Sequence, residues 1–238
     1  MGRAYEVRKA SILKTGAAKG KVYTTYAKEI YLVAKKGVPD PESNASLKRL
    51  IDKAKKEQVP NDIIERAIAK AKGAGQEDYT EVVYEGFGPG SSTLIIKTLT
   101  DNVNRTVGFV RTAFKKVNKS LGVSNSVSYN YDYHAVVSVK LVEEAVFNAL
   151  IEKEIDPIDF ETEDDIVTIT VNPREYDKLK DALESVDKEV SYEFDMVGMF
   201  PKDEVVLEGE ELEDFQKLYG LLDEIDDVTS IYHNVKMD

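Results

Sequence analysis

The chain has 238 residues, of which 42% are apolar and 32% are charged, as expected of a globular protein with one large or two to three small domains. It contains no cysteine and only two histidines, so structural disulfides and thiolate catalysis are excluded and a histidine-rich metal site is not expected. No window approaches the roughly 18 apolar residues of a membrane span and no N-terminal run fits a signal peptide, so we expect a cytoplasmic protein.

The charge is divided unevenly along the chain. The first 75 residues carry 17 Lys and Arg against 8 Asp and Glu, a net charge of +9, whereas the remainder carries 15 against 36, a net charge of −21. Residues 135–203 carry 7 basic against 19 acidic side chains, and residues 204–238 carry 2 against 11. One end of the chain could therefore dock on phosphate, while the rest would be repelled by it.

The pattern of the first 75 residues, the basic end, predicts a small helical bundle. Residues 1–20 are basic and poor in apolar side chains, so we expect either an arm that a partner orders or a solvated tail. Apolar side chains at helical spacing, with Gly and Pro between them, predict three helices. These are residues 22–36, residues 43 or 44 to 58 with Ser43 or Asn44 as the cap, and residues 60–73.

From residue 79 the pattern changes to strands separated by helices. Strands at 81–85 and 92–100, a helix at 104–118 and a strand at 125–131 come first. A strand–helix–strand–strand–helix–strand series, the ferredoxin-like order, then runs over 135–140, 142–154, 157–161, 166–171, 173–185 and 189–195. The chain ends with a strand near 205–207, a helix at 210–224 and a strand at 228–235.

The predicted fold class is α+β, with an N-terminal helical bundle plus two ferredoxin-like α/β domains, one inserted in the other. The domains are residues 1–75 (basic, helical), residues 76–134 with 204–238 (middle, discontinuous), and residues 135–203 (inserted, acidic). One interrupted α+β domain is the plainer alternative.

The basic end supplies the candidate nucleic-acid contacts. Lys and Arg provide most sequence-independent affinity for phosphate, although a solvated lysine-rich helix face is the common alternative. Arg105 is included because it follows Asn102 and Asn104, either of which can cap a helix whose N-terminus could meet phosphate. The candidates are Arg3, Arg8, Lys9, Lys14, Lys21, Lys28, Lys35, Lys36, Lys48, Arg49, Lys53, Lys55, Lys56 and Arg105.

Other motifs favour ordinary structure over chemistry. The loop Gly86–Gly90 lacks the Lys-Ser/Thr ending of a phosphate-binding loop, and a strand follows it, so a tight turn is favoured. The acidic cluster at 161–165 lacks the spacing of a calcium loop and is more consistent with a solvated turn. Neither histidine has a nucleophilic partner at a known spacing. We expect no catalytic residues, no metal, no cofactor and no small-molecule substrate.

Many short motifs occur in order between the first residue and about Tyr131. They are Met1-Gly2-Arg3, Lys35–Glu42, Asn44 with Leu47, Val59-Pro60, Ile64–Ile68, Lys70–Gly73, Tyr84–Gly90, Leu99–Asn102, Asn104–Thr106, Val110-Arg111 with Phe114, and Gly122 with Ser126-Val127. Together these motifs resemble the YebC family. The turn Pro39-Asp40-Pro41-Glu42 and Val59-Pro60 are similar to the shorter YeeN-type branch.

The resemblance implies a three-domain, cytoplasmic, non-enzymatic factor in gene expression. Family members have been assigned DNA binding and transcription regulation, and others act as translation factors on the ribosome at proline-rich stretches. We therefore expect DNA or ribosomal RNA, and with it the ribosome, as partner, and no membrane. Structured RNA is favoured because the acidic domains would be repelled along a bare duplex. A protein-interaction adaptor that uses its acidic α/β domains is the alternative, and a metal-dependent hydrolase using the acidic hairpin is a third hypothesis.

Overall fold

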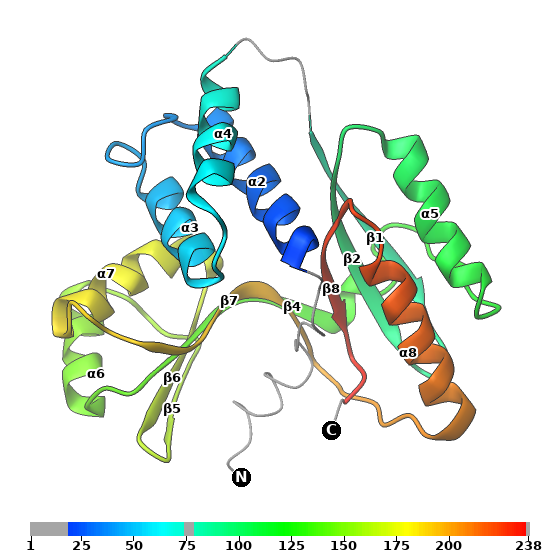
Figure 1. Cartoon of the computed structure of the whole chain (residues 1–238). Coiled ribbons are helices and arrows are strands. Elements are labelled where there is room, and N and C mark those ends of the chain that lie inside the picture. Colours follow the sequence, from blue (N-terminus) through cyan, green and yellow to red (C-terminus); the bar gives the residue numbers. More distant parts are fainter. Residues whose placement is uncertain (1–18, 74–78, 237–238) are drawn as a thin grey trace. The chain divides into compact units, whose positions relative to one another are not determined.

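The computed structural model describes residues 19–73 and 79–236, which divide into two compact units (Figure 1). One unit comprises residues 19–73, 79–126 and 208–231, and we call it the N-terminal unit. The other comprises residues 127–207 and 232–236, and we call it the inserted unit because its long segment interrupts the N-terminal unit along the chain. The division into three domains with the boundaries given above stays a prediction.

Three helices at the start of the N-terminal unit form what we call the helical region. Their bounds are α2 (Lys19–Lys36), α3 (Ala45–Lys56) and α4 (Asn61–Lys72). Asn44 caps α3, since its side-chain oxygen accepts a hydrogen bond from the backbone N–H of Leu47 at 3.1 Å. Their apolar faces close one core that includes fully buried Ile30, Leu47 and Ala54. The three predicted helices are therefore confirmed, with ends that differ by at most three residues.

The rest of the N-terminal unit is built on a four-stranded sheet in the order β3-β1-β2-β8. The elements are β1 (Thr80–Phe87), β2 (Thr93–Thr100), α5 (Val103–Lys115), β3 (Ser120–Leu121), α8 (Gly209–Asp223) and β8 (Val228–His233). Strand β1 is antiparallel to both β2 and β3. Figure 1 shows α5 and α8 side by side along this sheet. Asn102 caps α5 by accepting a hydrogen bond from the Arg105 backbone N–H at 3.1 Å.

The Gly-rich segment is the tight turn that the sequence predicts between β1 and β2. Gly88 N–H donates to the Ser92 carbonyl at 2.8 Å, and Ser92 N–H donates to the Pro89 carbonyl at 3.1 Å. Gly86 is required by packing, because a Cβ atom there would lie 2.5 Å from the Phe114 ring.

The inserted unit is built on a second four-stranded sheet, in the order β5-β6-β4-β7. Its elements are β4 (Tyr131–Val139), α6 (Glu143–Glu152), β5 (Asp159–Glu163), β6 (Ile166–Val171), α7 (Tyr176–Val186) and β7 (Tyr192–Pro201), with short 3-10 turns at Ser128–Asn130 and Pro173–Glu175. Strand β4 is antiparallel to β6 and β7, and β5 is antiparallel to β6. This is the spatial order of a ferredoxin-like unit, and α6 and α7 pack against the sheet around one buried core.

Two predicted strands of the first sheet are wrong. Residues 125–131 do not form a strand: Asn125 has a φ of 63°, Ser128–Asn130 is a 3-10 turn, and Asn130 N–H donates to the Val127 carbonyl at 3.0 Å. The strand near 205–207 is reduced to a single parallel bridge between Val205 and Val235. The alternation that suggested the first strand arises from a turn with one buried and one exposed face. Strand β1 lies next to β2, in the position that the third strand of a ferredoxin-like series, predicted near residues 205–207, would have in the sheet.

Candidate nucleic-acid interface

Helix α3 carries the densest positive charge among the described elements. Its 12 residues contain five basic side chains and one acidic one, a net charge of +4. Leu47, Ile51 and Ala54 are buried on one face, which turns four lysines to solvent and leaves Arg49 half-buried. The exposed four are Lys48, Lys53, Lys55 and Lys56.

The position of these lysines also has a local cause. Lys53, Lys55 and Lys56 occupy the last turn of α3, and Lys35 and Lys36 occupy the last turn of α2. Cations there face the negative end of the helix dipole, a favourable arrangement without any ligand. Lys48 lies 3.6 Å from Glu42 and Lys36 lies 3.2 Å from Glu81, and both are exposed pairs that solvent screens.

Three other predicted contacts, Lys21, Lys28 and Arg105, instead bind carboxylates of the same unit. Lys21 lies 2.9 Å from the Asp223 carboxylate and also donates to the Asp223 carbonyl. Lys28 lies 3.0 Å from Asp227 Oδ1 and donates to the carbonyls of Asp226 at 3.1 Å and Leu99 at 3.3 Å. The Lys21 and Lys28 side chains are only 14% and 12% exposed, so both charges are largely withdrawn from solvent.

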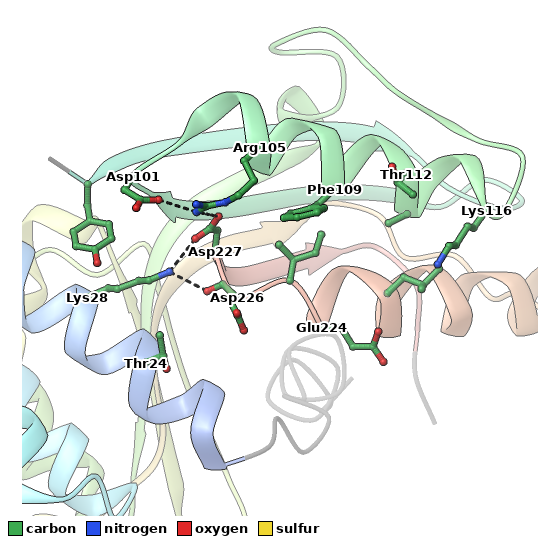
Figure 2. Close-up of a pocket in the computed structure, with 14 residues that line it drawn as sticks. Thr24, Lys28, Asp101, Arg105, Phe109, Thr112, Lys116, Glu224, Asp226 and Asp227 are labelled. Atoms are coloured by element: carbon green, nitrogen blue, oxygen red, sulfur yellow. Dashed lines mark hydrogen bonds and ion pairs between the residues drawn. The ribbon is translucent and has the colours of Figure 1, made fainter. Parts of the chain in front are cut away.

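Asp227 is the centre of a polar cluster that joins α2, β2 and α5 (Figure 2). Its Oδ2 accepts hydrogen bonds from Thr106 at 2.7 Å, Arg105 at 2.9 Å and Thr100 at 3.1 Å, while Lys28 reaches its Oδ1. Burial on its own would raise the pKa of Asp227, but the hydrogen bonds from Thr106, Arg105 and Lys28 outweigh it and lower the pKa to about 2. The cluster thus holds an ionised carboxylate at neutral pH.

Arg105 pairs with two acidic side chains. Besides Asp227 it reaches Asp101 Oδ1 at 2.7 Å, and hydrogen bonds to Asp227 and then to Asp101 raise its pKa further. The helix N-terminus at which it was predicted to meet phosphate is also occupied by the Asn102 side chain.

A cleft of about 710 Å³ opens beside this cluster (Figure 2). Figure 2 shows Arg105, Phe109, Thr112 and Lys116 arrayed along α5, with Glu224 opposite. The lining has three basic side chains and four acidic ones, and two of the basic ones already pair with Asp227. Its charge is nearly balanced, so the cleft is a poor site for a polyanion.

Two tyrosines of the basic helix α2, Tyr26 and Tyr31, lie in the core of the helical region. Tyr26 and Tyr31 are 4% and 3% exposed. Tyr31 packs edge-to-face on Tyr79 with ring centroids 5.7 Å apart, and Lys35 and Lys70 lie over the Tyr31 ring at 5.4 and 5.8 Å. These rings therefore hold the helical region together and cannot stack on bases in this arrangement.

Sequence reasoning missed Asp227, whose carboxylate accepts hydrogen bonds from four side chains. The acidic run at 223–227 marked that segment as repelled by phosphate, and nothing in its spacing pairs it with α2, about 200 positions earlier. Thr100 and Thr106 flank the Asn102 cap and could have suggested a buried polar partner. Arg3, Arg8, Lys9 and Lys14 lie outside the described residues.

Clusters of metal-ligating side chains and membrane-spanning helices are both absent from the described part of the chain. Nowhere in residues 19–73 and 79–236 do three or more His, Asp or Glu side chains gather in a way that could hold a metal ion. Asp164 and Asp165 form the exposed turn between β5 and β6, with φ values of 48° and 62°. No helix in the described part of the chain is long and apolar enough to cross a membrane.

A basic helical region and two four-stranded sheets with helices make up the described part of the chain, and the comparisons assign this architecture to a known family of probable regulatory proteins. The chain belongs to the TACO1/YebC family: the model of the TACO1/YebC protein N-terminal domain matches residues 3–74, and the model of the second and third domain matches residues 79–235.

Its relatives extend over the whole chain. It is 48% identical to a probable transcriptional regulatory protein of Acholeplasma laidlawii over 99% of this chain and 98% of the relative. It is 44% identical to one of Pseudoalteromonas atlantica over 100% of this chain and 98% of the relative. These descriptions name a regulatory role and no enzymatic one, as the sequence predicts.

A solved structure supports the fold. The crystal structure of the conserved hypothetical protein Aq1575 from Aquifex aeolicus matches with a TM-score of 0.76 and 32% identity, over 94% of this chain and 93% of that one. The α+β fold class, with a helical N-terminal region and two four-stranded sheets with helices, is therefore confirmed.

Proposed function

We propose that the protein is a cytoplasmic, nucleic-acid-binding regulator of gene expression that holds phosphate with the helical region. The observation that carries this proposal is α3, which has a net charge of +4 and turns Lys48, Lys53, Lys55 and Lys56 to solvent. Neutralisation of several phosphates by such side chains supplies most non-specific affinity for nucleic acid. Lys35, Lys36 and Arg49 extend the same basic surface.

The ion pairs of Lys21, Lys28 and Arg105 give these residues a different role in the proposal. Each is matched by a carboxylate at 3.0 Å or less, so a phosphate would have to displace an existing partner. They act instead as positioning residues that fix α2 against β2, α5 and the segment after α8. The basic surface of α3 is thereby presented from a rigid support.

Structured RNA, including ribosomal RNA, is the favoured target, and duplex DNA is the second candidate. The whole chain has a net charge of −12, and the inserted unit is strongly acidic, so contact along an extended polyanion would bring repulsion. A short, compact site is compatible with a small basic surface. The relatives are described as probable transcriptional regulatory proteins, which keeps DNA as a candidate target. The resemblance to family members that act as translation factors keeps the ribosome as the other candidate.

The test is a charge reversal of the exposed last turn of α3 in the intact protein. The α3 triple variant carries Lys53→Glu, Lys55→Glu and Lys56→Glu, all exposed, so its fold should be retained by circular dichroism. A control variant carries Lys140→Glu, Lys153→Glu and Lys188→Glu, which are exposed residues of the inserted unit and change the net charge equally. Filter binding would use a structured ribosomal RNA fragment and a duplex DNA in parallel.

We expect the α3 triple variant to lose binding by at least about a hundredfold, since three charge-assisted contacts of about 1 kcal/mol each are removed and replaced by repulsion. The control should change affinity far less, because its reversed charges belong to the inserted unit and are not among the proposed contacts. Equal losses in the two variants would leave only an effect of net charge and would overturn the role of α3. The RNA-to-DNA affinity ratio of the unmodified protein decides between the two targets.

A further inference from the structure

The inserted unit exposes apolar side chains along one edge. Phe147 and Ile151 of α6 are 49% and 60% exposed, and Ile158, just before β5, is 54% exposed. Phe160 of β5 is half-buried, and its ring meets Phe147 edge-to-face at 5.7 Å between centroids. We call these four residues the apolar edge face.

The topology explains why these four residues lie on one surface. Strands β4 and β5 are each antiparallel to β6, so they are parallel to each other, and α6, which connects them, runs in the opposite direction. Phe147 and Ile151 are one helical turn apart, and Ile158 and Phe160 are two residues apart on one side of a strand. Because α6 and β5 run in opposite directions and Phe147 lies against Phe160, Ile151 further along the helix and Ile158 just before the strand lie at the same end of this surface.

Among the described residues, no further strand pairs with the outer side of β5 at this edge. In the order β5-β6-β4-β7, β5 is an outer strand, so only one of its sides is bonded within the sheet. Exposed edge strands next to apolar surface invite pairing unless something covers or repels it. Here the edge strand is also short and carries three carboxylates, which disfavours pairing with a second acidic edge.

The charge around the face selects the kind of partner. Residues 142–165 contain ten Asp and Glu and a single basic residue, Lys153, a net charge of −9. The last turn of α6 has no basic residue and ends in Glu152, with Glu154 and Asp156 close behind it in the sequence. Two cations lie at this end of the helix, Lys153 at the C-cap and Lys178, whose ammonium donates to the Glu154 carbonyl at 2.9 Å. The three carboxylates still outnumber them near the negative end of the helix dipole, so further cations from a partner would be favourable there.

We infer that the apolar edge face is a docking surface for a basic, amphipathic segment of another protein. Apolar side chains of the segment would cover Ile151 and Ile158, and its Lys and Arg would lie against the surrounding carboxylates. Nucleic acid and anionic membranes are repelled by the same charge. The surface uses none of the α3 lysines, so it adds a second partner to the proposed function and can fail independently of it.

The experiment measures binding of a fluorescein-labelled basic amphipathic peptide of roughly 15 residues, about four helical turns, by anisotropy with the intact protein. Its leucines lie at helical spacing among lysines. A second peptide replaces every leucine by serine at unchanged charge. The docking variant carries Ile151→Ser and Ile158→Ser, and its control carries Val123→Ser and Val206→Ser, which are 78% and 70% exposed elsewhere.

We expect the leucine peptide to bind the unmodified protein and its affinity to fall about tenfold in the docking variant, with little change in the control. Replacement of Glu152, Glu154 and Asp156 by their amides should weaken binding and flatten its salt dependence, unlike the matched change of Glu210, Glu211 and Glu213 on α8.

Three results would overturn the inference. They are equal binding of the leucine and serine peptides, equal losses in the docking and control variants, and formation of a dimer that the docking variant abolishes, since the face would then serve a second copy of this chain. In each case RNA and DNA binding by the docking variant is measured in parallel. Unchanged nucleic-acid affinity would leave the proposed function standing.

Discussion

Replacement of Asp227 by asparagine should destabilise the N-terminal unit strongly, although the change removes only a charge. Asp227 is 5% exposed and accepts hydrogen bonds from Lys28, Thr100, Arg105 and Thr106. An amide nitrogen in place of Oδ1 would face the Lys28 ammonium, and in place of Oδ2 the Arg105 guanidinium, neither of which can accept a hydrogen bond. It also leaves the buried Lys28 ammonium without its counter-charge.

The magnitude follows from the pKa. Lowering the pKa of Asp227 from 3.8 to about 2 means that the fold favours its ionised form by about 2 kcal/mol. Breaking a buried ion pair on one side typically costs about 3–5 kcal/mol. Because neighbouring carbonyls of Leu99 and Asp226 still bind Lys28, we expect a loss of about 2–4 kcal/mol at pH 7.

The dependence on pH separates this effect from a packing defect. The pKa is lower in the native state, so its stabilisation is present above pH 3.8 and is lost as the pH falls from 3.8 towards 2. The difference between the unmodified protein and Asp227→Asn should therefore narrow over that range. Asp101→Asn, which alters an exposed pair with Arg105, should shift stability much less at any pH.

Urea unfolding followed by circular dichroism gives the free energies, and hydrogen exchange of peptides from residues 19–36 and 223–233 localises the change. Faster exchange is expected in both segments, because the cluster links α2 to the loop before β8. An unchanged urea midpoint of Asp227→Asn at pH 7, or an equal loss of stability in Asp101→Asn, would refute the assignment of Asp227 as the centre of the polar cluster.

Three further outcomes are expected. In the α3 triple variant, the slope of log affinity against log salt concentration should become less steep by about 2 to 3. This value is three lost phosphate contacts multiplied by about 0.9 each on duplex DNA or about 0.7 each on single strands. An unaltered slope would contradict phosphate contacts by α3. Burial lowers the pKa of His233 to about 4, partly opposed by a backbone hydrogen bond at Val235. The free energy of unfolding should therefore fall by about 3 kcal/mol as the pH drops from 6.5 to 4. Urea midpoints that do not move in this range, or that move equally in His233→Gln, would contradict a lowered pKa of His233 in the folded protein. Gly86→Ala should cost about 1–3 kcal/mol in thermal or urea unfolding, because its methyl group would meet the Phe114 ring at 2.5 Å, and a stability equal to that of the unmodified protein would show that the ring can move aside.

The helices were predictable because local chemistry determines them. Asn44 and Asn102 cap the helices that follow them, and the apolar spacing of Leu47, Ile51 and Ala54 marks the buried face of α3. The short third strand of the first sheet was not predictable in this way. Strand β3 has two residues, and the alternation after it comes from a turn whose asparagine adopts a positive φ.

The partition of the basic residues into two groups could not be predicted from the sequence. Lys28 and Lys53 are both lysines on basic, amphipathic helices, and charge counts treat them alike. What separates them is the tertiary arrangement, which brings the acidic segment 223–227 to α2 across about 200 positions of chain. Long-range pairing of this kind leaves no periodicity in a single sequence.

This partition has a consequence for how the protein responds to salt. Exposed charges more than about 10 Å apart are largely screened at 0.1 M salt, whereas buried pairs are screened much less. The lysines of α3 are exposed and should release phosphate as salt rises, while the pair of Lys28 and Asp227, with side chains 12% and 7% exposed, should persist. Raising salt should thus dissociate nucleic acid without loosening α2 from β2 and α5. Loss of affinity and loss of hydrogen-exchange protection at residues 19–36 at the same salt concentration would instead mean that the two groups of lysines act together.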